Sequence, residues 1–143
     1  FYLERINESQ TLKEMHQFAL SLILTLTESM SQLNYSGDSA VIREVVSYVT
    51  TNYKENITLA KLAEHVHINS TYLSTLFKQE MGIPFTAYLN NIRLARSEEL
   101  LRTSYRSITE ICLSVGFSSP SYFTKVFKKH YGMGPKEYRT QYQ

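Results

Sequence analysis

Apolar residues recur every three or four positions along most of this chain, a spacing that is typical of amphipathic helices. A long stripe lies within residues 8–34, and a last short helix is expected from residue 135. Between them the pattern predicts helices over residues 39–54, 58–66, 70–81, 84–102, 107–116 and 120–131. No segment shows a convincing strand pattern. The sequence therefore predicts an all-α protein.

The second half of the chain repeats one pattern, in residues 58–88 and again in residues 107–138. Each copy has a short amphipathic helix, a tight turn, a polar cap, a second helix with an aromatic residue and then F-K, and a closing glycine. The matched positions are Leu62, Ala63, Val66, Tyr72, Leu73, Phe77, Lys78, Gly82 and Tyr88 in the first copy and Ile111, Cys112, Val115, Tyr122, Phe123, Phe127, Lys128, Gly132 and Tyr138 in the second. This is the spacing of the helix-turn-helix, whose second helix enters the major groove of DNA. We therefore predict two helix-turn-helix subdomains, about 58–82 and 107–132, joined by a long linker helix at about 84–102.

A break separates the first stripe from the repeats. The segment YSGDS at 35–39 interrupts the periodicity at Gly37 and offers Asp38 or Ser39 as the next N-cap, so we divide the chain into residues 1–38 and 39–143. The amphipathic helix at 8–34 has two interpretations: it packs on the repeat domain or on an upstream domain, or it pairs with a second copy as a homodimer. Because the chain starts with Phe1 and not Met, we expect it to be part of a longer protein.

Charge and composition permit nucleic-acid binding without requiring it. Residues 1–38 hold two Lys/Arg and five Asp/Glu, whereas residues 39–143 hold thirteen and eight. The single cysteine, Cys112, cannot form an internal disulfide and falls on a core position, as expected for a cytoplasmic protein. The motif H-x-H at 65–67 lacks a third metal ligand, and no nucleophile elbow or phosphate-cradling loop is present. We expect no enzyme activity, no metal and no cofactor.

The second copy carries a long and specific motif, I-x-x-I-C-x-x-V-G-F-x-S-x-S-Y-F-x-x-x-F-K-K-x-x-G-x-x-P-x-x-Y, from residue 108 to residue 138. On this motif the chain resembles the DNA-binding domain of the AraC/XylS family of bacterial transcription regulators, over about residues 40–138. The resemblance implies sequence-specific binding of promoter DNA, with two recognition helices in successive major-groove segments. It also implies RNA polymerase as a partner and, upstream, an effector-binding or receiver domain.

The resemblance also suggests which side chains meet DNA. The base-reading positions transfer to Thr71, Ser74, Thr75, Ser121, Thr124 and Lys125. Phosphate contacts are expected from Lys78, Arg93, Arg96, Lys128 and Lys129 and from backbone amides near Asn69 and Ser119. Family members often have a basic residue where Thr75 stands, so we expect an A·T-tolerant first half-site. Arg93 has a rival role in a buried structural pair, for which Glu110 is a candidate partner.

The alternative function is a helical protein-interaction or dimerisation module with weak non-specific DNA binding. Such a module would expose apolar residues on the second helix of each repeat. This sequence instead places Ser, Thr and Lys at those positions, and we favour DNA binding by residues 39–143.

Overall fold

The computed structural model describes residues 19, 20, 22, 23 and 37–142, and none of these lies in a β-strand. The all-α prediction is confirmed. The chain divides into two compact units, Phe1–Ala40 and Val41–Gln143. In the first unit, residues 19, 20, 22 and 23 are helical, and most of the predicted stripe at 8–34 lies outside the described residues. Within the described part of the chain, no helix has the length and apolar character needed to cross a membrane.

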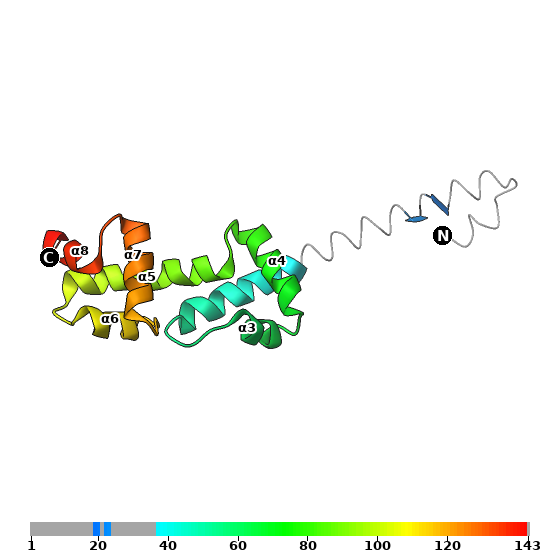
Figure 1. Ribbon diagram of the computed structural model, residues 1–143. Coiled ribbons are helices and arrows are strands. Elements are labelled where there is room, and N and C mark those ends of the chain that lie inside the picture. The colour runs from blue at the N-terminus through cyan, green and yellow to red at the C-terminus, as the bar shows by residue number, and fades with distance from the viewer. Residues whose placement is uncertain (1–18, 21, 24–36, 143) are drawn as a thin grey trace, which may run out of the picture. The chain divides into compact units, whose positions relative to one another are not determined.

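The second unit contains both predicted helix-turn-helix subdomains (Figure 1). A helix over residues 37–52, cyan in Figure 1, leads into them. The elements that follow are α3 (Leu59–His65), α4 (Ser70–Met81), α5 (Phe85–Thr103), α6 (Ile108–Ser114), α7 (Pro120–Tyr131) and α8 (Pro135–Tyr142). α3 and α4 form the first helix-turn-helix, α6 and α7 form the second, and α5 is the linker helix. In Figure 1, α4 and α7 both run crosswise to α5.

The helix before α3 begins earlier than the sequence suggested. Gly37, Asp38 and Ser39 are all helical, so the break expected at Gly37 and the cap expected at Asp38 or Ser39 were wrong. A glycine inside a helix costs about 1 kcal/mol relative to alanine. Burial of Ile42, Val45 and other residues further along the same helix offsets this cost.

Two apolar cores share the linker helix. The N-terminal part of α5 contributes Phe85 and Leu89 to the first core, and its C-terminal part contributes Leu94 and Leu101 to the second. The other members are Ile42, Val45, Val49, Ile57, Leu62, Ala63, Leu73, Leu76 and Phe77 in the first core and Ile111, Cys112, Val115, Phe117, Phe123 and Phe127 in the second. The matched repeat positions thus fill equivalent sites, which is why a single pattern appears twice in the sequence.

The last helix closes the second core and fixes the loop between α5 and α6. The hydroxyl of Tyr138 on α8 donates to Glu98 Oε1 at 2.9 Å, and burial together with this carboxylate raises the pKa of Tyr138 to about 12. The guanidinium of Arg139 donates to the carbonyl oxygen of Arg106 at 2.6 Å. α6 then starts with a capping box between Ser107 and Glu110. The loop is therefore held from both sides.

Candidate nucleic-acid interface

The first candidate recognition helix, α4, is fixed at both ends and along one side. At its start, Asn69 Oδ1 accepts the backbone N–H groups of Thr71 at 2.8 Å and Tyr72 at 3.3 Å. At its end, Gly82 takes the left-handed conformation with φ 73°. Leu73, Leu76 and Phe77 on one side are buried. The opposite side of α4 is thereby free to face a ligand.

The outward side of α4 carries short hydroxyl side chains. Thr71, Ser74, Thr75 and Lys78 are all exposed. Thr75 Oγ1 donates to the carbonyl oxygen of Thr71 at 3.2 Å, which leaves its methyl group and acceptor lone pairs for a base edge. Hydroxyl and methyl contacts discriminate between bases less strongly than the bidentate contact of arginine with guanine.

The second candidate recognition helix, α7, is built in the same way but is more basic. Ser119 Oγ accepts the N–H of Tyr122 at 3.3 Å, and Gly132 ends the helix with φ 80°. Phe123 and Phe127 are buried. The exposed residues of α7 include Ser121, Thr124, Lys125, Lys128 and Lys129. α7 carries three lysines and no acidic residue, whereas in α4 Lys78 is balanced by Glu80. The two recognition surfaces therefore differ in charge.

Two matched tyrosines lie at the edge of the recognition helices. Tyr72 is 49% exposed, and its repeat partner Tyr122 is 45% exposed. A position next to the buried Leu73 is rotated by about 100° around the helix, which is enough to bring Tyr72 to the surface. Asn90 Nδ2 on α5 donates to the Tyr122 hydroxyl at 2.9 Å. This contact, which the sequence did not predict, ties α7 to the linker helix.

Beside α7 lies an open groove of about 520 Å³, formed with the first half of α5. Its walls include Asn90 and Asn91 from α5 and Tyr122, Lys129 and His130 from α7. The groove adds hydrogen-bonding and cationic groups next to the predicted base-reading side of α7. The sequence repeat gave no signal for it, because α5 occurs once.

Arg93 has a structural position, and we withdraw it as a phosphate contact. Its side chain is only 9% exposed. Arg93 Nε donates to the carbonyl oxygen of Tyr53 and Nη2 to that of Glu55, both at 2.8 Å. Burial lowers the pKa of the guanidinium, although an arginine remains protonated in proteins. The expected partner Glu110 instead accepts the N–H of Ser107 at 2.7 Å. A buried arginine that already binds two carbonyls cannot reach a DNA backbone.

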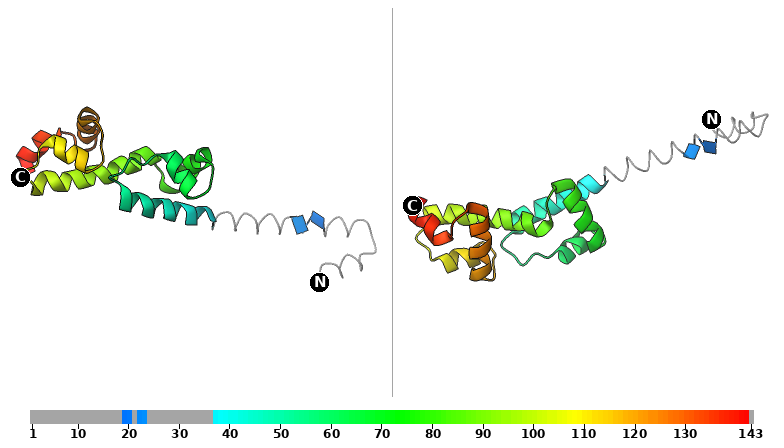
Figure 2. Two further views of the ribbon diagram at one scale, coloured as in Figure 1. Left: turned by 90° about the horizontal axis from the view of Figure 1, so that it is seen from below. Right: turned by 45° about the horizontal axis from the view of Figure 1, so that its top comes forward.

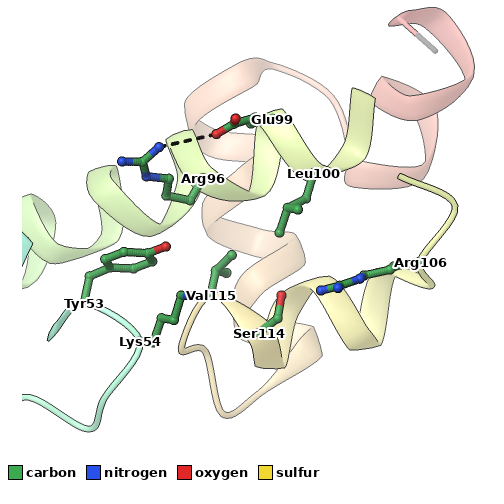
Figure 3. A pocket seen from close by; sticks show the side chains of 8 residues that line it. All are labelled: Tyr53, Lys54, Arg96, Glu99, Leu100, Arg106, Ser114 and Val115. Atoms are coloured by element: carbon green, nitrogen blue, oxygen red, sulfur yellow. Dashed lines mark hydrogen bonds and ion pairs between the residues drawn. The ribbon is translucent and has the colours of Figure 1, made fainter. Parts of the chain in front are cut away.

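Arg96 also lies outside the recognition surface. Its guanidinium pairs with Glu99 at 3.4 Å, and the two side chains border a pocket with Tyr53 and Lys54 (Figure 3). α7 passes behind this pocket in Figure 3, and helix 37–52 and α7 lie on opposite sides of α5 in Figure 2 (left). Arg96 therefore lines this pocket and not the groove beside α7, and whether it contacts a DNA phosphate stays a prediction.

The helix starts offer fewer free amides than we expected. Asn69 already binds two N–H groups of α4, and Ser119 binds one of α7. Pro120, the first residue of α7, has no N–H. Ser121 contributes the remaining amide in the first turn of α7. Phosphate binding near Asn69 and Ser119 therefore depends on fewer backbone donors than an uncapped helix would supply.

The turns of the two helix-turn-helix subdomains share an unusual backbone conformation. His67 in the first turn has φ 56° and Gly116 in the second has φ 97°. A residue with a side chain is rare in this region, whereas glycine adopts it readily. A Cβ atom on Gly116 would lie 2.8 Å from the carbonyl oxygens of both Tyr53 and Lys54 and 3.0 Å from Arg93 Nε. We call this contact between Gly116, Arg93 and residues 53–55 the junction, because it joins both helix-turn-helix subdomains to α5.

These features define a double helix-turn-helix domain, in which two capped helices with polar outer sides are fixed on one linker helix. Comparison with known proteins agrees with this architecture. The helix-turn-helix domain family matches residues 62–141. The regulatory protein PocR of Salmonella typhimurium is 37% identical over 100 residues, which is 70% of this chain and 33% of PocR. The chain spans a third of the length of PocR and about half of the length of two further curated regulators, from Escherichia coli and Streptococcus mutans.

Solved structures give the same result. A transcriptional regulator from Chromobacterium violaceum, described as having an AraC-type DNA-binding domain, matches with a TM-score of 0.65 and 32% identity over 74% of this chain and 95% of that one. The DNA-binding domain of AdpA, solved in complex with a target DNA, matches with a TM-score of 0.67 and 26% identity over 71% and 91%. The chain belongs to the AraC family of transcription regulators and contains the DNA-binding domain of that family.

Proposed function

We propose that this chain binds promoter DNA sequence-specifically, with α4 and α7 in successive major-groove segments, as the DNA-binding part of a bacterial transcription regulator. The observation that carries the proposal is the pair of equivalent helices on one linker helix, each buried along one side and exposing Ser, Thr and Lys on the other. The alternative protein-interaction module would need apolar side chains on these outer sides. Binding to promoter DNA would imply a cytoplasmic location.

The two recognition helices are expected to contribute unequally. α7 exposes Lys125 beside Ser121 and Thr124, and a lysine bonds well to the O6 and N7 acceptors of guanine. α4 offers Thr71, Ser74 and Thr75, which suit thymine methyl groups and weaker hydrogen bonds. We infer that the half-site under α7 is read more strictly and that the half-site under α4 tolerates A·T pairs.

Phosphate binding is expected first from the exposed lysines of the two recognition helices. Lys78 on α4 and Lys128 and Lys129 on α7 are exposed near the base-reading residues. If about three to five phosphates are neutralised, the logarithm of affinity should fall with the logarithm of salt concentration at a slope of about −3 to −5.

Selection from randomised duplexes, followed by fluorescence anisotropy across salt concentrations, tests this proposal. We expect a preferred site of about two helical turns. Replacing Lys125 with Ala should cost about 1–3 kcal/mol and relax the sequence preference in one half-site only. Lys136→Ala is the matched control, because it removes an exposed lysine from α8 and not from a recognition helix. Binding that depends on salt but shows no sequence preference would contradict the proposal.

We also infer two protein partners, RNA polymerase and a second copy of the chain. The pairing prediction rests on the stripe at 8–34, of which Leu20 and Ile23 are helical with 48% and 60% exposure. Sedimentation of the whole chain and of a chain lacking residues 1–36 should show self-association only in the former. A whole chain that stays monomeric at high micromolar concentration would exclude pairing through this segment.

A further inference from the structure

A pocket lies between α5 and α6, where the turn after helix 37–52 approaches both (Figure 3). We call it the α5–α6 pocket. Its volume is about 240 Å³. The residues that line it are Tyr53, Lys54, Arg96, Glu99, Leu100, Arg106, Ser114 and Val115. None of these is among the residues of α4 and α7 that we assign to DNA.

We propose that the α5–α6 pocket binds a small organic anion that carries a phosphate group. Three cations from three separate elements line it: Lys54 after helix 37–52, Arg96 on α5 and Arg106 before α6. Glu99 is the one acidic residue of the lining, so the net charge is +2. Phosphate is the anion that such a set recognises best, since each guanidinium can donate two parallel hydrogen bonds.

The pair between Arg96 and Glu99 does not prevent this binding. Its guanidinium nitrogen and carboxylate oxygen are 3.4 Å apart, and the two side chains are 56% and 61% exposed. An ion pair that is so exposed contributes little free energy. The Arg96 side chain points toward Glu99 in Figure 3, so it has to turn to the pocket to meet an entering phosphate, and the exposed ion pair adds little to the cost of this turn.

The position of Arg106 is fixed by its backbone. Its carbonyl oxygen accepts the guanidinium of Arg139 at 2.6 Å, and the next residue, Ser107, is held in the capping box. The Arg106 side chain itself is exposed, and in Figure 3 it extends along α6 toward Ser114. A cation on an anchored backbone loses less conformational freedom on binding than one on a mobile loop.

The rest of the lining selects for an apolar body on the ligand. Leu100 is half-buried and Val115 is only 1% exposed, and the ring of Tyr53 lies beside the pocket in Figure 3. Binding sites for small molecules combine such apolar walls with a few polar groups. A phosphate joined to an aromatic or aliphatic group should therefore bind more tightly than inorganic phosphate.

The pocket adjoins the junction, and no residue of α7 lines it. The pocket residues Tyr53 and Lys54 supply the carbonyl oxygens that lie against Gly116 at the junction. Val115, which also lines the pocket, directly precedes Gly116 in the chain. A ligand in the pocket would therefore touch the segment that sets the orientation of the two helix-turn-helix subdomains. This consequence for DNA rests on the proposed function, but anion binding itself does not.

The test is a titration of the whole chain with phenyl phosphate, followed residue by residue through amide NMR shifts. We expect saturable shifts around Lys54, Arg106 and Ser114, and weaker binding of inorganic phosphate. Arg106→Gln should weaken phenyl phosphate binding by about tenfold, the loss expected for a hydrogen bond to a charged group. Arg102→Gln is the matched control, because Arg102 is exposed on α5, pairs with Glu98 and does not line the pocket. The affinity of this variant for phenyl phosphate should change less than twofold.

Equal losses in the two variants, or shifts confined to α4 and α7, would overturn the proposal. So would a glutamate-rich peptide that displaces phenyl phosphate and binds more tightly, since the pocket would then serve a protein partner. Repeating the titration with bound duplex separates the two proposals. Shifts that persist support a pocket distinct from the DNA surface, and shifts that vanish overturn it. A chain that binds phenyl phosphate but no duplex contradicts the proposed function alone.

Discussion

Replacing Gly116 with Ala should destabilise the domain by about 2–5 kcal/mol. The left-handed conformation costs a residue with a Cβ atom about 1–2 kcal/mol, and overpacking adds about 1–3 kcal/mol. Overpacking is expected because the new methyl group would lie 2.8 Å from two carbonyl oxygens, those of Tyr53 and Lys54. Neither oxygen can move freely. The Tyr53 carbonyl oxygen accepts a hydrogen bond from Arg93 Nε at 2.8 Å, and Tyr53 and Lys54 both belong to the turn after helix 37–52.

Gly132→Ala is the matched control for this prediction. Gly132 has φ 80°, close to the value of 97° at Gly116, but an added Cβ atom would have nothing within 4 Å. Gly132→Ala should therefore lower the free energy of unfolding only by the conformational cost of about 1–2 kcal/mol. Urea unfolding followed by circular dichroism measures both variants. Equal destabilisation of the two variants would mean that the junction is not tightly packed.

The repeat made most of the fold predictable from the sequence. Periodicity indicated the helices, and the closing glycines Gly82 and Gly132 marked helix ends that the structure confirms. These signals are local, since a cap acts within three or four residues and a buried side recurs with each turn. Gly37 was misleading for the same reason, because its local preference is outweighed by packing farther along the helix.

The junction could not be predicted in this way. Arg93 donates hydrogen bonds to Tyr53 and Glu55, which lie 40 and 38 positions earlier in the chain. Periodicity carries no information about contacts between residues so far apart in sequence. In the sequence, Arg93 falls on a long amphipathic helix, where phosphate binding and a buried structural pair were equally reasonable roles for it. The α5–α6 pocket is hidden for the same reason, since Lys54 lies far before Arg96 and Arg106 in the chain.

The exposed sides of α4 and α7 were easier to predict than the edges. All six predicted base-reading residues are exposed, as their helical phase required. The exposure of Tyr72 is not evident from the sequence, because an aromatic residue next to the buried Leu73 resembles a core position. Contact of these six residues with bases stays a prediction.

One rigid domain is expected to read two half-sites together. The junction and the shared helix α5 fix α4 relative to α7, so the two helices should bind DNA only at one spacing. Inserting five base pairs between the half-sites turns one of them by about half a helical turn, to the opposite side of the duplex. Only one recognition helix can then engage, and the affinity gained by linking the two is lost.

Fluorescence anisotropy on the selected duplex and on the duplex with the five-base-pair insertion therefore tests the account most directly. We predict that the insertion weakens binding by at least about 100-fold, to the level of a single half-site. Mutating the half-site under α4 should then cause no further loss in the inserted duplex. Equal affinity for the two duplexes would contradict the account, because it would show that the helix-turn-helix subdomains bind independently or that only one of them binds.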